Sequence, residues 1–168
     1  MRRRRQDVKL ILMNISVTYG TGSGPTELSA FDSALNDAGV ANYNILHLSS
    51  VIPPEAVVEV KKAEPQSAEY GHRLYAVLSS RIETEPEKEA WAGLGWIQDE
   101  TGRGLFVEHQ GGSESEVEGL IRDSLENMRQ YRKNEYGEVQ FKMVGIKCKD
   151  RPVCALVCAP YMSEGWGK

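Results

Sequence analysis

Period-two alternation of apolar and polar side chains is the feature of this sequence that most restricts its fold. From Ile11 to Tyr19 every odd position carries an apolar side chain, while Asn14, Ser16 and Thr18 are polar. Such alternation is typical of a strand with one buried face. Six further runs also read as strands, at residues 43–48, 73–82, 89–100, 104–110, 138–149 and 153–162. We therefore expect about seven strands, with the three runs between residues 73 and 110 forming an antiparallel meander.

Two segments carry helical spacing instead. An apolar stripe predicts one helix that Gly39 can terminate, formed by Leu28, Phe31, Leu35 and Ala38. Ser113 and Glu116 form a capping-box pattern ahead of a second stripe that continues to Arg132. Many strands with only two helices predict one mixed α/β domain over residues 1–168.

Composition narrows the classes of function. The 168 residues suit one core, and the net charge of -4 argues against a nucleic-acid partner and favours a small molecule. The cysteines Cys148, Cys154 and Cys158 contain no C-x-x-C pair, so we expect neither disulfides nor zinc, and a cytoplasmic location. We interpret residues 1–7 as a basic flexible tail and find no membrane-spanning segment.

A glycine-rich stretch, Gly20 to Gly24, lies between the first strand and the first helix. We interpret it as a flexible connection. A phosphate-cradling loop is the alternative, although the spacing matches neither common nucleotide-binding fingerprint. The three histidines show no metal-ligand spacing, so no metal site is predicted.

The pair Ser49-Ser50 ends a strand and is followed at once by Pro53-Pro54, which forces an extended bend. A second pair, Ser79-Ser80, lies inside a strand and has no such neighbours. Glu108 lies in an otherwise apolar strand, where it either faces solvent or is partly desolvated, and desolvation would raise its pKa. A carboxylic acid in that state can donate a proton near neutral pH.

Three segments, "FDSALNDAG", "NYNILHLSSVIPPEA" and "GLFVEHQG", resemble the pyruvoyl-dependent arginine decarboxylase family in order and spacing. The resemblance implies a four-layer αββα sandwich with mainly antiparallel sheets, self-cleaved into two chains, residues 1–49 and 50–168. It also implies a homotrimer of cleaved protomers with active sites between neighbours.

The chemistry implied by the resemblance begins with a cut between Ser49 and Ser50. The Ser50 hydroxyl attacks the Ser49 carbonyl to give an ester, and β-elimination and hydrolysis then leave an N-terminal pyruvoyl group. This covalent cofactor, without metal or pyridoxal phosphate, forms a Schiff base with L-arginine and accepts electrons as CO2 departs, giving agmatine.

The same resemblance assigns further roles. Glu108 matches the proton donor, Asn44 matches a processing residue that can stabilise the oxyanion at Ser49, and Asp32 matches the carboxylate that faces the guanidinium. The remaining matches are to substrate-pocket residues: Leu28, Leu35 and Ser49. Two alternatives stay open, namely the same chemistry on another amino acid, and an uncleaved small-ligand-binding module.

Overall fold

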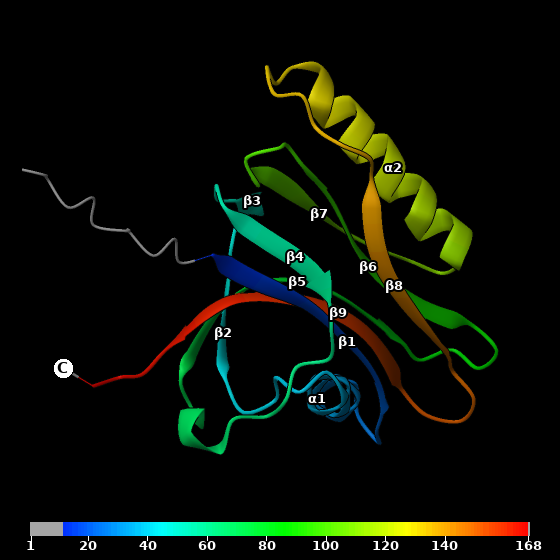
Figure 1. Ribbon diagram of the computed structural model, residues 1–168. Coiled ribbons are helices and arrows are strands. Elements are labelled where there is room, and N and C mark those ends of the chain that lie inside the picture. Colours follow the sequence, from blue (N-terminus) through cyan, green and yellow to red (C-terminus); the bar gives the residue numbers. More distant parts are fainter. Residues whose placement is uncertain (1–11, 168) are drawn as a thin grey trace, which may run out of the picture.

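The computed structural model describes residues 12–167, so the basic tail at residues 1–7 lies outside the described residues. Two helices enclose two stacked sheets, as Figure 1 shows, with α1 (Glu27–Asp37) below the lower sheet and α2 (Glu114–Gln130) above the upper one. One short 3-10 turn, Ser67–Glu69, precedes the strand β5 (Arg73–Glu83). The chain is therefore the four-layer αββα sandwich expected.

Each sheet mixes strands from distant parts of the chain. The larger sheet has five strands in the spatial order β2 (Asn44–His47), β5 (Arg73–Glu83), β9 (Val153–Glu164), β1 (Met13–Ser23) and β4 (Ala56–Val60). Its two outer pairs, β1 with β4 and β2 with β5, are parallel, and the inner pairs are antiparallel. The smaller, wholly antiparallel sheet has the order β3 (Val51–Ile52), β7 (Gly104–Gly111), β6 (Glu89–Gln98) and β8 (Gln140–Lys147).

Three hydrophobic cores separate the four layers. The central core packs the two sheets together through large side chains such as Ile15, Trp96 and Phe106. A second core lies between α1 and the five-stranded sheet, and a third lies between α2 and the four-stranded sheet. Because β7 has cores on both faces, its first four residues are all buried.

The predicted meander is wrong. β6 and β7 form an antiparallel hairpin as expected, but β5 belongs to the other sheet, so the chain changes sheets between Glu83 and Glu89. Periodicity reports which side chains alternate along a strand and not which sheet the strand joins. The described residues also contain nine strands, because the short β3 and the parallel β4 follow the Pro53-Pro54 bend where we expected only an extended turn.

The glycine-rich stretch is also different from the expectation. Residues 20–23 continue β1, paired with β9, and α1 lies directly on them. A Cβ at Gly20 or Gly22 would lie 2.4 or 2.3 Å from the backbone of Ala34. The glycines therefore serve close helix-to-sheet packing, and the loop needed for a phosphate cradle is absent from this part of the described chain.

The helices follow their capping signals. Ser113 caps α2 and accepts a hydrogen bond from the Glu116 backbone, while the Glu116 side chain accepts from Gly112. Thr26 caps α1 through a capping box with Ser29, and the helix ends ahead of Gly39, whose φ is 79°. The apolar stripe predicted for α1 is partly wrong. Leu28 is 75% exposed, and alanines fill most of the buried face of the helix.

The cysteines are core residues, as expected. Cys154 and Cys158 both face the α1 side of β9, and burial raises their pKa values to about 11 and about 12. Of the helices within residues 12–167, none has the length and apolar character needed to cross a bilayer.

Candidate active site

Ser50 has an unusual backbone conformation. Its φ is 70°, in the left-handed region, where an L-residue with a side chain costs about 1–2 kcal/mol. Glu55, on the other side of the proline pair, also has a positive φ of 63°. The segment that follows the serine pair is therefore held in a strained path, and strain of this kind is often found at functional sites.

The Ser50 side chain meets the carboxylate predicted from the apolar strand. Its hydroxyl donates a hydrogen bond to Oε1 of Glu108 at 2.5 Å. Glu108 lies on β7 just beyond the four buried residues, on the face that it shares with Phe106. Glu108 is exposed in the chain, which therefore does not take this carboxylate out of water as one interpretation of its strand suggested.

Backbone contacts hold the residues on the C-terminal side of the serine pair. The Phe106 N–H donates to the Ser50 carbonyl at 2.8 Å, and Val51 and Ile52 pair with Leu105 and Gly104 as β3. The Tyr161 hydroxyl donates to the Val51 carbonyl at 2.9 Å. The sequence analysis missed Tyr161, although a proline in a central strand, at position 160, signals an irregularity there.

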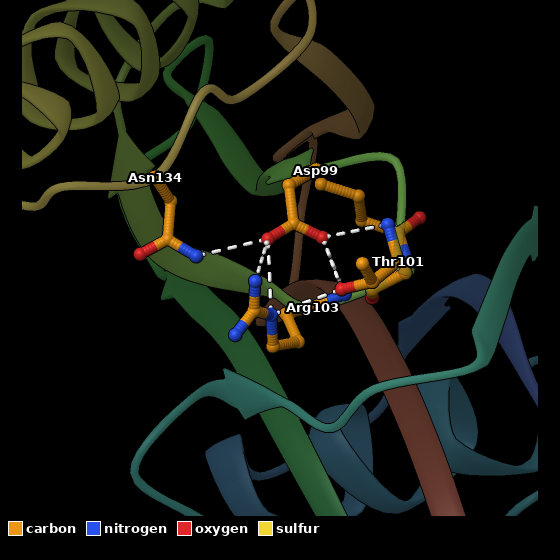
Figure 2. Close-up of polar contacts among 6 residues, drawn as sticks. Asp99, Thr101, Arg103 and Asn134 are labelled. Carbon is orange, nitrogen blue, oxygen red and sulfur yellow. Dashed lines mark hydrogen bonds and ion pairs between the residues drawn. The ribbon is translucent and has the colours of Figure 1, made fainter.

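A turn ordered by Asp99 supports the far end of the same segment, and Figure 2 shows the side-chain contacts that order this turn. The Asp99 carboxylate accepts hydrogen bonds from Thr101 and Asn134 and forms an ion pair with Arg103 at 3.0 Å. These hydrogen bonds, led by that of the Thr101 hydroxyl, hold the pKa of Asp99 well below its usual range. The Thr101 carbonyl in turn accepts from the Glu55 N–H at 2.7 Å, so the turn fixes the end of the strained segment.

Asn44 is not brought to Ser49 within one chain. Its side-chain amide donates to the Gly71 carbonyl at 2.8 Å, and β2 then runs away from it in extended form. Leu48 still continues the ladder through a bond to Ala76. At about 3.3 Å per strand residue, Leu48 lies about 13 Å from Asn44, beyond the reach of an asparagine side chain.

The α1 residues also lie apart from Ser50. Asp32 is exposed on the outer helix layer, and the described residues give its carboxylate no hydrogen-bond or ion-pair partner. Leu28 is exposed on the first turn of the same helix, whereas Leu35 is 8% exposed in the core beneath it. A five-stranded sheet separates this helix from β3, so one protomer does not assemble these residues with Ser50.

Comparison with known sequences identifies the family. The sequence profile described as pyruvoyl-dependent arginine decarboxylase matches residues 14–165. The chain belongs to this family. A pyruvoyl-dependent arginine decarboxylase of Halobacterium salinarum is 40% identical over 94 residues, which cover 56% of this chain and 58% of that protein. A protein of the same name from Thermococcus sibiricus is 33% identical over 146 residues, which cover 84% of this chain and 91% of that protein.

The local geometry fits the prosthetic group of this family. A pyruvoyl group would replace Ser50, the residue whose side chain already faces a carboxylate and whose carbonyl is held by a backbone N–H. Among residues 12–167, no three His, Cys, Asp or Glu side chains are grouped to hold a metal ion. The residues around Ser50 can thus hold a small group, orient its carbonyl and exchange a proton with it.

Proposed function

We propose that the chain cuts itself between Ser49 and Ser50 and that the product decarboxylates L-arginine to agmatine and CO2. The observation that carries the proposal is the 2.5 Å hydrogen bond from the Ser50 hydroxyl to Glu108, at a serine of left-handed backbone within the family's serine-proline motif. The cut would divide the chain into residues 1–49 and 50–168, both remaining in one domain.

The contact between Ser50 and Glu108 supports a role for Glu108 in the cut. A serine hydroxyl is a weak nucleophile unless a neighbouring base accepts its proton, and the Glu108 carboxylate is in hydrogen-bond range to do so. The oxygen of Ser50 then attacks the Ser49 carbonyl. Strain in the left-handed backbone at Ser50 is relieved as the peptide bond becomes an ester, which favours the shift.

Glu108 would also serve the decarboxylation. The pyruvoyl group, once formed, supplies an electron-withdrawing carbonyl that stabilises the charge left when CO2 departs. Glu108 stands beside position 50 and would return a proton to the substrate carbon. Asp32 would accept bidentate hydrogen bonds from the guanidinium, and the exposed Leu28 on the same helix would contact the substrate's methylene chain.

The separation of these residues supports an assembly of several chains, for which the family resemblance implies a trimer. Asn44, Asp32 and Leu28 lie away from Ser50 in one chain, yet all three are exposed. A neighbouring protomer would bring its α1 and β2 to the Ser50 of the first, completing a site that one chain leaves open and desolvating Glu108. In that trimer Glu108 would be less accessible to water than in one protomer. Sedimentation equilibrium should give about three protomer masses.

Intact-protein mass spectrometry on fresh material tests the cut. We expect fragments of roughly 5 and 13 kDa, the larger about 17 Da lighter than a serine N-terminus would make it, because ammonia is lost. A single 18.7 kDa species after prolonged incubation would contradict the proposal.

The substrate is tested by replacing Asp32. Asp32→Asn keeps the shape of the side chain but loses its charge, so we expect arginine kcat/KM to fall about tenfold or more. Asp123→Asn, at an exposed position on α2, is the matched control. Unchanged arginine turnover in Asp32→Asn, with cleavage intact, would show that the assignment of Asp32 to the guanidinium is wrong.

A further inference from the structure

The proposed cut removes the covalent bond that holds position 50 on its N-terminal side. From then on, the place of the new chain end depends on contacts made by residues 50–56 with the rest of the protein. The β3 strand in this segment is only two residues long, and the far end of the segment is held at Glu55 by the Asp99 turn. Closer to the cut, only a few contacts hold the segment, and one of them comes from the opposite sheet.

That contact is made by Tyr161. Its hydroxyl donates to the carbonyl of Val51, the residue directly after the one that would carry the pyruvoyl group. Tyr161 lies on β9 in the five-stranded sheet, and Val51 lies on β3 in the four-stranded sheet. The hydrogen bond therefore crosses the space between the sheets, and it does not depend on the ladder between β3 and β7.

A β-bulge directs Tyr161 toward this space. In the β5·β9 ladder Tyr75 pairs with Met162 and Ala76 pairs with Pro160, so Tyr161 is the extra residue. Bulges redirect side chains and occur often beside active sites, and proline within a sheet is largely confined to edges and bulges. The Tyr161 ring packs at 6.3 Å, centroid to centroid, on Phe106, whose N–H holds the Ser50 carbonyl.

The hydroxyl of Tyr161 is a stable donor. Burial, and then the negative charge of Glu108, raise the pKa of Tyr161, so the phenol stays protonated through neutral and moderately alkaline pH. The Tyr161 ring packs on Phe106, and Glu108 lies two residues further along the same face of β7. One bulged residue therefore contacts both the chain end and the part of β7 that carries the carboxylate.

We propose that Tyr161 is a positioning residue, which holds the Val51 carbonyl so that position 50 remains against Glu108 before and after the cut. The inference rests on the proposed function, because it assumes that cleavage takes place. It assigns Tyr161 no contact with substrate: the tyrosine acts through the backbone of Val51. The ring would maintain packing on Phe106, and the hydroxyl would fix the chain end.

The test is Tyr161→Phe in the full-length chain, which keeps the ring and removes the hydroxyl. Tyr75→Phe is the matched control, because the Tyr75 hydroxyl also donates one hydrogen bond, to Glu164 at 2.8 Å. We expect Tyr161→Phe to slow cleavage and to lower kcat for arginine about 3- to 10-fold, with KM within about twofold, as expected for one lost hydrogen bond. Melting temperatures of the two variants should agree within a few degrees.

Hydrogen exchange supplies a readout that is independent of activity. In the cleaved protein, amides at the start of the larger chain should exchange faster in Tyr161→Phe than in Tyr75→Phe, because the segment opens more often. If wild type cleaves and the two variants match in cleavage, kcat and exchange, the inference about Tyr161 is overturned alone. If wild type never cleaves, the proposed function fails and the inference fails with it.

Discussion

The chain contains two Ser-Ser pairs, and each touches one of two adjacent residues of β7. The hydroxyl of Ser50 donates to the side chain of Glu108, while the hydroxyl of Ser79 donates to the backbone carbonyl of His109 at 2.6 Å. Ser79 lies inside β5, paired with Val157, and is 4% exposed. Ser50 lies outside the regular ladders with a φ of 70°.

The difference shows that backbone conformation, and not the dipeptide, decides what a serine pair can do. At Ser79-Ser80 the peptide bond is part of an antiparallel ladder between β5 and β9, so its geometry is fixed and no carboxylate meets its hydroxyls. At Ser49-Ser50 the chain leaves one sheet and enters the other, which allows a strained backbone and brings a base to the hydroxyl. The Ser79 hydroxyl joins the two sheets by a hydrogen bond to the backbone, whereas the Ser50 hydroxyl faces a carboxylate.

The largest expected effect is the difference in cleavage between two variants, one without the Ser50 hydroxyl and one without the Ser80 hydroxyl. Ser50→Ala removes the nucleophile, so we expect no cleavage and no decarboxylation above background, with the chain still folded. Ser80→Ala removes the second hydroxyl of the other pair and should cleave at the wild-type rate. Gel electrophoresis with intact mass measures both. Cleavage of Ser50→Ala at the same bond would contradict the distinction between the pairs.

Glu108 is expected to have the next largest effect. Glu108→Gln can still accept a hydrogen bond from Ser50 but cannot take or give a proton near neutral pH. We therefore expect cleavage and decarboxylation each to slow by about 100-fold or more. Single-turnover rates of arginine decarboxylation, measured on the cleaved fraction, separate the two steps. Glu114→Gln, exposed on the first turn of α2, removes the same charge elsewhere and should have no such effect.

The local features of the two serine pairs and their surroundings could be predicted from the sequence. The Pro53-Pro54 bend set Ser49-Ser50 apart from its twin, and the capping box at Ser113 located the start of α2. Glu108 was singled out as a carboxylate in an apolar strand. These signals depend on a few neighbouring residues, so a single sequence contains them.

Features that depend on distant residues could not be read in this way. The alternation in β5 does not reveal that β6 joins the other sheet, and the short β3 carries too few residues to show a period. The glycines of β1 resembled a loop because their purpose, the close approach of α1, lies in another element. The proposed contacts of Asn44 and Asp32 with a Ser50 would require a second chain, which one sequence does not describe.

The Ser79 hydroxyl is expected to contribute to the stability of the fold, whereas the Ser50 hydroxyl is expected to contribute to cleavage. Ser79→Ala removes the hydrogen bond to the His109 carbonyl between the two sheets, so we expect the free energy of unfolding to fall by about 1 kcal/mol. Urea denaturation of the uncleaved Ser50→Ala background measures this value without interference from the cut. In an otherwise wild-type chain, cleavage of Ser79→Ala should proceed normally. A loss of cleavage with no loss of stability would show that the two pairs are coupled through β7.

The smallest expected effect is on the pH dependence of the free energy of unfolding. It involves the His109 side chain, which contacts Ser124 at 2.7 Å on the α2 side of β7. Burial lowers the pKa of His109, and the nearby Glu108 opposes this shift only in part. As pH falls below about 6.5, the unfolded chain binds a proton before the folded one does. This contribution to stability is therefore complete above the unfolded pKa and is lost as pH falls through the folded pKa.

Replacing His109 should flatten that part of the pH profile. Unfolding free energies of His109→Gln and of the exposed-site control His47→Gln, both in the Ser50→Ala background, would be compared between about pH 7.5 and pH 5. We expect a shallower slope for His109→Gln alone. Equal slopes would contradict the lowered pKa and would mean that the His109 ring is open to solvent in the folded protein. The hydrogen bond to Ser124 would then not keep this ring packed between β7 and α2.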